Sequence, residues 1–469
     1  MNELLSKLAE LARPRVRPAL DDGFRPAALA NRAFRRAVAD SGQGVKLVIG
    51  LQRPDGTTSV YETQVFADGH PMAGLNLPYT ERLVKLLLWQ KGGFRVTIGG
   101  PEAVGRHIKE TYSPAGARAF DYDFMGETTY EHPFEIVLTE ADGVPPAKET
   151  SVAIGRHLEG NRIGFDLGAS DRKVAAVIEG ESAFSEEVVW DPRNQADPSY
   201  HYNEINAALK AAAAKMPRVD AVGGSSAGVI INNRPMIASL FRGVPKDLFN
   251  KKVKSIFLDL AKEWGVPFEV ANDGDVTALA GSMSLNDNAV LGIAMGSSEA
   301  AGYVNELGNI TGWLNELAFA PIDCNPEAPA DEWSGDTGCG VQYLTQQAVF
   351  RLARQVGLKL DESLPLADQL EQVQELLEAS DETARKIWET IGVYAGYAVA
   401  HYADFYTIKH LLLLGRVTSG GGGPIILEKA REVFAADFPE LAKQIELHLP
   451  DEKTRRVGQA VAAASLPAL

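Results

Sequence analysis

The sequence has little cysteine and no long apolar run. Only Cys324 and Cys339 occur among 469 residues, and neither has a second cysteine at CxxC spacing. This excludes a disulfide framework and a four-cysteine metal site, so both thiols are expected to be reduced and structural. No stretch approaches the roughly 18 apolar residues of a membrane span, and Met1–Leu5 does not resemble a signal peptide. We therefore expect a cytoplasmic protein with no membrane partner.

Positive charge is also scarce. The chain has 46 Lys and Arg against 62 Asp and Glu, a formal net charge of −16. Such a chain has no summed field to attract phosphate backbones, and nothing in residues 1–60 has the pattern of a helix-turn-helix, so nucleic acid is not an expected partner. The exception is an arginine-rich start, which we interpret as a docking surface in preference to a nucleic-acid arm. Its arginines are Arg13, Arg15, Arg17, Arg25, Arg32, Arg35 and Arg36.

The hydrophobic pattern of residues 1–150 predicts an α/β domain. Two β-branched runs flank Pro54-Asp55-Gly56 and indicate a hairpin over 45–66. Residues 80–90 and 101–112 have helical patterns on either side of a predicted strand. The composition becomes loop-like near 145–158, where we place a domain boundary.

Beyond residue 158 the pattern changes to glycine-punctuated strands alternating with helices. A strand pair is predicted at 162–179, a helix over 249–264, and short buried strands at 219–222, 268–271 and 289–295. This order indicates mixed α/β sheets, in which ligands bind at the carboxyl ends of strands.

The first strand end suited to ligand binding is the turn after Asp166. Gly168 lets the backbone approach a ligand, while exposed amides, Ser170 and the nearby Lys173 offer groups for phosphate oxygens. Asp166 is placed to hold a cation through water. An ordinary hairpin turn has the same appearance.

Two further small-residue turns follow predicted strands. Gly296, Ser297 and Ser298 form a second phosphate-turn candidate, and two such turns make a clamp for a polyphosphate. The glycine cluster that contains Gly415, Gly420 and Gly421 is a candidate floor for a nucleoside, unless it is a flexible surface loop.

Asn272 and Asp273 lie between a predicted strand and an Ala-rich helix. There Asp273 can act as general base on a substrate hydroxyl, and Asn272 can hydrogen-bond a neighbouring hydroxyl. The competing interpretation is that an Asp at this place only caps the helix.

Together these motifs resemble the ROK family, within the superfamily of sugar kinases and actin, from about Arg162 onward. Asp166-Leu167-Gly168-Ala169-Ser170 is similar to the first phosphate motif, Asp-x-Gly-Gly-Thr, and 296–302 to the second, Gly-Thr-Gly-x-Gly-Gly-Gly. Asn272-Asp273 is similar to the motif whose Asp is the catalytic base. Gly415-Arg416-Val417 resembles the start of the adenosine motif, and 457–464 the closing helix.

The resemblance implies a two-lobed actin-like ATPase fold of ribonuclease H-like type, with an additional N-terminal α/β domain at 1–150. The first lobe is expected at 158–285, with the helix 455–469 returning to it, and the second at 286–454. It further implies ATP and Mg²⁺ as cofactors, with the turns at 166–170 and 296–302 on opposite sides of the phosphates. A homodimer stays open.

The sugar site is where the chain departs from the family. Residues 223–228, with Ser225 and Ser226, stand where the family has the loop before the sugar pocket, and Glu316 matches a sugar-binding Glu. Phe319 replaces the family's zinc-binding His, and Cys339 lacks its partner cysteines. We therefore expect no zinc site and a protein free of zinc. Arg242 suggests an acidic or phosphorylated acceptor, although a surface salt bridge is the preferred interpretation.

The resemblance predicts an ATP-dependent kinase that phosphorylates a hydroxyl of a hexose or sugar derivative. The main alternative is a non-catalytic sugar- or nucleotide-binding regulatory protein on the same fold. A serine hydrolase is disfavoured because Ser226, in a Gly-x-Ser-x-Gly match, is followed by strand and turn instead of helix. Asp121, Asp123 and His132 are interpreted as the wet face of an edge strand in preference to a metal cluster.

Overall fold

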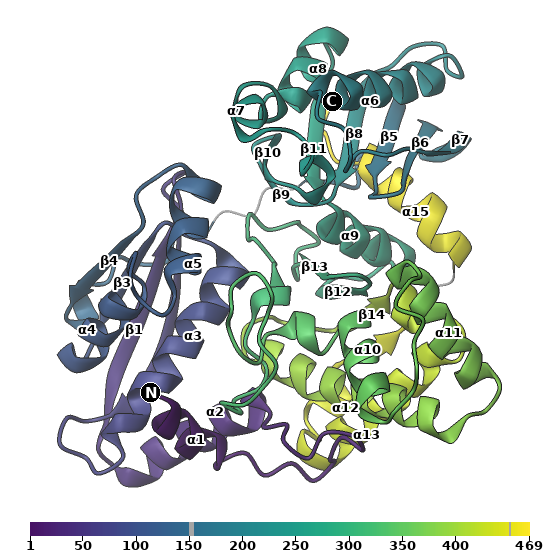
Figure 1. The fold of residues 1–469 in the computed structure, drawn as a ribbon. Coiled ribbons are helices and arrows are strands. Elements are labelled where there is room, and N and C mark those ends of the chain that lie inside the picture. The colour runs from purple at the N-terminus through teal and green to yellow at the C-terminus, as the bar shows by residue number, and fades with distance from the viewer. Residues whose placement is uncertain (150–153, 450–451) are drawn as a thin grey trace.

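The first of the three parts seen in Figure 1 is an α/β domain built on the expected hairpin. The structure, a computed structural model, describes residues 1–149, 154–449 and 452–469, so part of the expected boundary at 145–158 lies outside the described residues. The elements of this part are α1 (Asn2–Ala9), α2 (Ala27–Ser41), β1 (Gly44–Gln52), β2 (Thr58–Phe66), α3 (Asn76–Lys91), β3 (Arg95–Gly99), α4 (Glu102–Thr111), α5 (Ala119–Asp123), the π-helical η2 (Phe124–Tyr130) and β4 (Glu135–Thr139). The four strands form a sheet of order β2-β1-β3-β4, in which β1 is antiparallel to both of its neighbours.

The second part is the first lobe, a five-stranded sheet of order β11-β8-β5-β6-β7. Its elements are β5 (Asn161–Leu167), β6 (Asp171–Ile178), β7 (Glu181–Val189), α6 (Pro198–Ala213), β8 (Ala221–Ser226), β9 (Val229–Ile231), β10 (Arg234–Ile237), α7 (Lys246–Leu248), the π-helical η5 (Phe249–Val253), α8 (Ile256–Trp264), β11 (Phe268–Asn272) and α9 (Asp273–Leu285). The helix predicted over 249–264 is divided at Lys254 and Ser255. Lys254 forms an ion pair with Glu131 of the N-terminal domain, at 2.8 Å, which the local sequence pattern does not encode.

The third part is the second lobe, whose sheet has the order β13-β12-β14-β15. Its elements are β12 (Val290–Met295), β13 (Glu299–Val304), α10 (Gln346–Gln355), α11 (Leu366–Glu378), α12 (Glu382–Tyr402), β14 (His410–Leu414), α13 (Gly422–Asp437), α14 (Leu441–Gln444) and β15 (Glu446–His448). Among the described residues, no helix is both long and apolar enough to cross a membrane.

The helix α15 (Glu452–Ala464) returns from the second lobe to the first (Figure 1). It packs on β5 and β8 at very short range: a Cβ on Gly164 would lie 1.9 Å from the carbonyl oxygen of Ala460, and one on Gly223 would lie 1.8 Å from that of Ala463. Only glycine permits this approach of helix and sheet. The same helix contacts α9, so α9 and α15 lie between the two lobes.

The N-terminal domain and the second lobe share one hydrophobic core, since the buried residues of both belong to a single cluster. Phe24 packs on Tyr394 with ring centroids 4.8 Å apart. Arg32 and Arg35 both form ion pairs with Asp404, at 2.9 and 2.6 Å. The arginine-rich segment therefore docks on the second lobe, as the sequence suggested.

A buried ion-pair network joins these two parts. Lys85 of α3 contacts Asp121 of α5 at 3.0 Å and also Asp336 of the second lobe, and all three side chains are at most 9% exposed. Trp89 donates a hydrogen bond to Asp121 at 2.8 Å, and Arg118 pairs with Asp336. Each buried charge is thus paired, which is the condition for tolerating it.

The interpretation of Asp121, Asp123 and His132 as one face of an edge strand is wrong. Asp121 and Asp123 lie in the helix α5, and His132 stacks on Phe94 in the loop before β4. Asp121 pairs with the buried amine of Lys85 from within the helix α5. This contact between distant segments outweighs the local alternation of apolar and acidic residues.

Candidate functional site

A cavity of about 510 Å³ lies at the carboxyl ends of strands from both lobes. Of the expected site residues, eight line it: Gly168, Asn272, Asp273, Gly296, Ser297, Ser298, Glu316 and Gly415. Both small-residue turns therefore face one cavity. Phe124 of the N-terminal domain also contributes to its wall.

Seven expected site residues do not line the cavity: Asp166, Ser170, Lys173, Ser225, Ser226, Gly420 and Gly421. The hydroxyl of Ser225 is buried and donates to Asp166 at 2.6 Å, so it orients that carboxylate. Ser226 is fully buried, and β9 follows it after two residues, which is not the strand-turn-helix of a hydrolase nucleophile. Gly420 and Gly421 immediately precede α13.

Asp273 is held at the first position of α9. The preceding residue, Asn272, caps the helix by accepting a hydrogen bond from Gly274 at 2.7 Å, and its amide donates to the carbonyl of Gly228 at 2.8 Å. Asn272, not Asp273, is therefore the helix cap, which leaves the Asp273 carboxyl facing the cavity. Burial, and next the negative charge of Asp166, raises the pKa of Asp273 to about 6.

Close backbone packing fixes Asp273 relative to the second candidate phosphate turn. A Cβ on Gly274 would lie 2.2 Å from the carbonyl oxygen of Ala301, and a Cβ on Gly302 would lie 2.1 Å from the carbonyl carbon of Gly274. Two glycines thus let the start of α9 contact β13, which itself begins directly after Ser298.

The first candidate phosphate turn is ordered by hydrogen bonds around Asp166 at the end of β5. Asp166 accepts hydrogen bonds from Ser225 and from Gln459 of α15, the latter at 3.2 Å, and Lys173 lies 3.7 Å away. Burial raises the pKa of Asp166. The negative charge of Asp166 contributes to the raised pKa of Asp273, and carboxylates such as these two would supply the hard oxygen donors that Mg²⁺ prefers.

Besides Asp273, the acids Glu299, Glu316, Asp331 and Glu332 line the cavity, and sequence reasoning did not single out Glu299. Neither of its carboxylate oxygens makes a well-formed hydrogen bond to a described residue, although the side chain is buried at the start of β13. Burial, and to a lesser extent the charge of Glu316, raises the pKa of Glu299 to about 8. Burial together with Asp273 and Asp275 raises the pKa of Glu316 to about 8 as well. These carboxyls can donate or accept hydrogen bonds to ligand hydroxyls near neutral pH.

We expect Glu299 to make the ligand-free protein less stable as pH rises from 5 to 8. Because its pKa is higher in the folded than in the unfolded state, folding binds a proton in this range, and the stabilisation is lost as pH passes about 8. Glu299→Gln should melt like the wild type at pH 5. At pH 8 it should melt about 4 °C or more higher, since 1 kcal/mol moves the melting temperature by about 2–4 °C in a domain of about 150–250 residues.

The measurement is thermal unfolding followed by circular dichroism at both pH values. The control is Glu428→Gln, which alters an exposed carboxylate of α13 and should leave the pH dependence unchanged. Equal pH dependence of Glu299→Gln and the wild type would contradict the assignment.

Two arginines, Arg193 and Arg242, line the first-lobe side of the cavity. Neither forms an ion pair with any residue that the structure describes. Burial and the nearby charge of Arg242 lower the pKa of Arg193, whose Nε is buried without a hydrogen bond. The surface salt bridge considered for Arg242 is therefore absent from the described part of the chain.

Phe319, expected at the position of the zinc-binding histidine of ROK proteins, is part of an aromatic wall. Phe319 stacks on Trp89 of α3 with ring centroids 4.0 Å apart, and Phe124 lies 6.2 Å from it. Cys339 is fully buried next to the Lys85 network, and burial raises the pKa of its thiol to about 11. The N-terminal domain thus fills the space beside the cavity with aromatic side chains.

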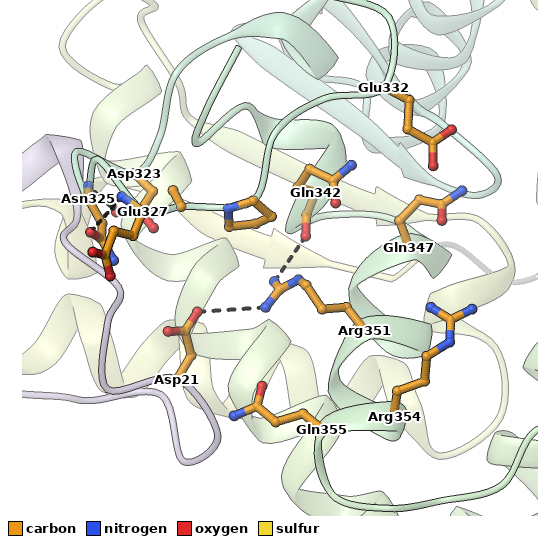
Figure 2. Close-up of a pocket in the computed structure, with 12 residues that line it drawn as sticks. Asp21, Asp323, Asn325, Glu327, Glu332, Gln342, Gln347, Arg351, Arg354 and Gln355 are labelled. Carbon is orange, nitrogen blue, oxygen red and sulfur yellow. Dashed lines mark hydrogen bonds and ion pairs between the residues drawn. The ribbon is translucent and has the colours of Figure 1, made fainter. Parts of the chain in front are cut away.

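A second, wider groove of about 730 Å³ opens beside this cavity and shares Glu332, Gln342 and Gln347 with it. Figure 2 shows that Arg351 bridges it, donating to the backbone of Gln342 at 3.1 Å and pairing with Asp21 at 3.8 Å. Neither of the two candidate phosphate turns lines this groove, and Asp273 does not line it either. The groove therefore adjoins the cavity but does not contain the groups proposed for catalysis.

Comparison with known proteins finds the fold only through solved structures. No family profile and no curated protein sequence matches the chain. The ROK hexokinase from Thermus thermophilus matches with a TM-score of 0.51 at 17% identity, over 65% of this chain and 97% of that one. A ROK family transcriptional regulator, a homologue of the E. coli MLC protein, matches with a TM-score of 0.53 at 18% identity, over 69% and 81% of the two chains. The chain therefore has the two-lobed actin-like ATPase fold of ROK proteins, as the sequence motifs implied, with an N-terminal α/β domain added to it.

Proposed function

We propose that the protein is an ATP-dependent kinase that transfers the γ-phosphoryl group to a hydroxyl of a sugar or sugar derivative. The observation that carries this proposal is the single cavity lined by Asp273, with a raised pKa, and by both phosphate turns. A helix cap alone does not account for Asp273, because Asn272 already supplies the cap.

In this mechanism the acceptor oxygen attacks the γ-phosphorus as the bond to the ADP oxygen breaks, and Asp273 accepts the hydroxyl proton. ADP and a phosphate ester form, and the proton leaves from Asp273 to solvent. A weakly basic carboxylate suffices because the proton moves late, and most of the acceleration comes from positioning and charge neutralisation. Mg²⁺, held near Asp166 and Asp273, would neutralise phosphate charge. Asn272, Glu299 and Glu316 orient the acceptor.

Arg193 and Arg242 extend the proposal to the acceptor class. Two guanidinium groups without carboxylate partners favour a ligand with an anionic group, such as a sugar acid or a sugar phosphate. The aromatic wall at Phe319 supports a substrate other than the one bound through the family's histidine. The second candidate is a regulatory protein that binds the same ligand without turnover, which this altered wall also favours.

The test is a panel of neutral hexoses, amino sugars, hexose acids and hexose phosphates, incubated with ATP and Mg²⁺. We expect an anionic acceptor to release ADP and to gain a phosphoryl group in mass spectrometry. Arg242→Ala should raise its KM about 10–100-fold, since a hydrogen bond to a charged group contributes roughly 1.5–3 kcal/mol. The KM of ATP should stay unchanged.

Lys246→Ala, which removes an exposed charge near the same loop, is the matched control. A rise in the KM of ATP alone would assign the arginines to the nucleotide and overturn the acceptor class. Tight binding of an acceptor with no turnover across the panel would replace the kinase with the regulatory protein.

A further inference from the structure

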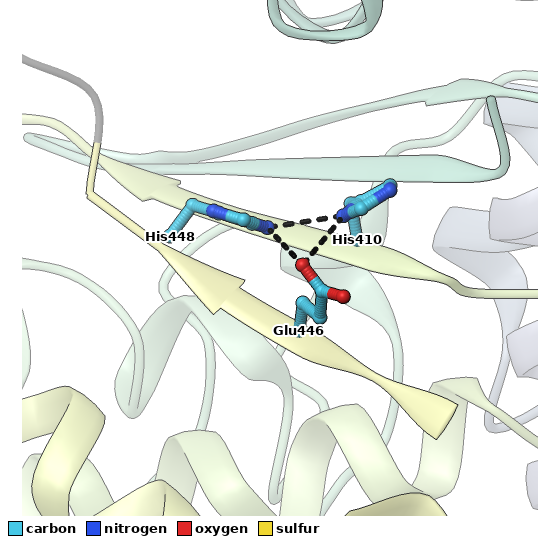
Figure 3. Close-up of side chains that lie close together, drawn as sticks. All are labelled: His410, Glu446 and His448. Carbon is cyan, nitrogen blue, oxygen red and sulfur yellow. Dashed lines mark hydrogen bonds and ion pairs between the residues drawn. The ribbon is translucent and has the colours of Figure 1, made fainter. Parts of the chain in front are cut away.

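Three potential metal ligands share one face at the edge of the second-lobe sheet. The strands β14 and β15 pair in parallel, with His410 opposite Glu446 and Leu412 opposite His448. Glu446 and His448 are two residues apart and therefore project to the same side of β15. Figure 3 shows the two imidazoles and the carboxylate converging on one point.

The distances between the converging atoms match those of a metal coordination sphere. His410 Nδ1 lies 3.0 Å from His448 Nε2 and 3.7 Å from Glu446 Oε2, and the last two atoms are 3.8 Å apart. In a tetrahedral zinc site with bonds of about 2.0–2.1 Å, neighbouring ligand atoms are separated by about 3.3 Å. A small adjustment of side chains brings all three atoms to that separation.

A fourth residue orients His410 for this role. Its other ring nitrogen, Nε2, lies 3.1 Å from Asp287 Oδ2, and Asp287 is also bound by Lys409 and by the backbone amide of Asn288 at 2.8 Å. A carboxylate oxygen at this distance accepts a hydrogen bond from Nε2, which places the proton of His410 on that nitrogen. The lone pair of Nδ1 then faces the other two ligands, as in carboxylate–histidine–metal arrangements.

The proposed site is also open to solvent. Glu446 is 68% exposed, which leaves solvent access for a water molecule as a fourth ligand.

We propose that His410, Glu446 and His448 bind a divalent transition-metal ion of the zinc class. Two nitrogen donors and one carboxylate oxygen favour this class over Mg²⁺ or Ca²⁺. The site shares no residue with the cavity that contains Asp273, so its metal is separate from the cation of phosphoryl transfer. The metal would hold the three-residue edge strand β15 against β14. The strand β15 is the last strand before α15.

This proposal differs from the sequence-based expectation of a zinc-free protein. That expectation considered the family's ligand positions around Phe319 and Cys339, where the required cysteines and histidine are missing. The three residues proposed here come together only through the pairing of β14 with β15.

The test uses the full chain purified without a histidine tag and stripped with a chelator. Calorimetry with Zn²⁺ should give one ion per chain, and Co²⁺ should give the visible absorption of a tetrahedral site with nitrogen and oxygen ligands. Both cysteines are buried, so a sulfur-to-cobalt charge-transfer band is not expected. Added Zn²⁺ should raise the melting temperature by mass action.

The variants separate a built site from adventitious binding. His448→Gln and Glu446→Gln should remove tight binding, while Asp287→Asn, which alters only the orienting group, should weaken it about 10–100-fold with the stoichiometry unchanged. His157→Gln, at another histidine near a carboxylate, is the control and should bind like the wild type. Equal affinity of His448→Gln and the wild type, or no binding by the wild type, would overturn the proposal and leave a simple hydrogen bond between the two histidines.

Discussion

Asp273→Asn is expected to retain nucleotide binding and to lose about 10²–10⁴-fold in turnover, the usual contribution of a positioned acid or base. The amide keeps the shape of the side chain but cannot accept the acceptor's proton. Turnover would be measured by ADP release with the acceptor found in the panel, and nucleotide affinity by calorimetry. Asp247→Asn, an exposed substitution in the first lobe, should behave like the wild type.

The pH dependence provides a second readout of the same residue. The wild-type kcat/KM should fall as pH drops below about 6, because the pKa of Asp273 is raised to about 6 and the protonated acid is not a base. The residual kcat/KM of Asp273→Asn should not show this decrease at low pH. Full turnover by the variant would reject Asp273 as the general base.

Lys85→Met is expected to destabilise the protein by about 3–5 kcal/mol, the typical cost of breaking a buried ion pair. The substitution leaves Asp121 and Asp336 in the interior without the amine that both contact. We expect a large fall in the melting temperature and in the denaturant midpoint. The double variant Lys85→Met/Asp121→Asn should recover part of the loss, because it removes one of the orphaned charges.

The control is Arg95→Ala, which breaks the exposed pair with Glu135 and should cost no more than about 1 kcal/mol. A loss in Lys85→Met no larger than in this control would mean that the network does not hold the N-terminal domain to the second lobe.

The parts of the site that could be predicted from the sequence are those carried by short segments. The turns at Gly168 and Gly296 follow apolar strands, and α9 begins at Asp273, as the local pattern indicated; all of them line one cavity, while their roles as phosphate turns and base stay predictions. The hairpin at Pro54-Asp55-Gly56 was predicted for the same reason. Local backbone preference decides each of these features.

The parts that could not be predicted depend on contacts between distant segments. Glu299 is a candidate ligand group because it is buried without a strong partner, and burial is not encoded in neighbouring residues. Arg193 is a candidate for binding an anionic ligand because the positive charge of Arg242 lies near it. The local sequence around Asp121 predicts an exposed strand, whereas in the structure Asp121 is buried and pairs with Lys85, 36 residues away in sequence. A single sequence contains no signal for such pairings.

The return of α15 to the first lobe has a consequence for biosynthesis. All strands of the first-lobe sheet leave the ribosome before the second lobe is made, but the helix that covers Gly164 and Gly223 is translated after the whole of that lobe. Until α15 has been translated, it cannot cover the glycine face of β5 and β8, and the packing of the first-lobe sheet is incomplete. The two lobes are thus interleaved in the order of translation, and a fragment that ends between them lacks the segment needed to finish the first.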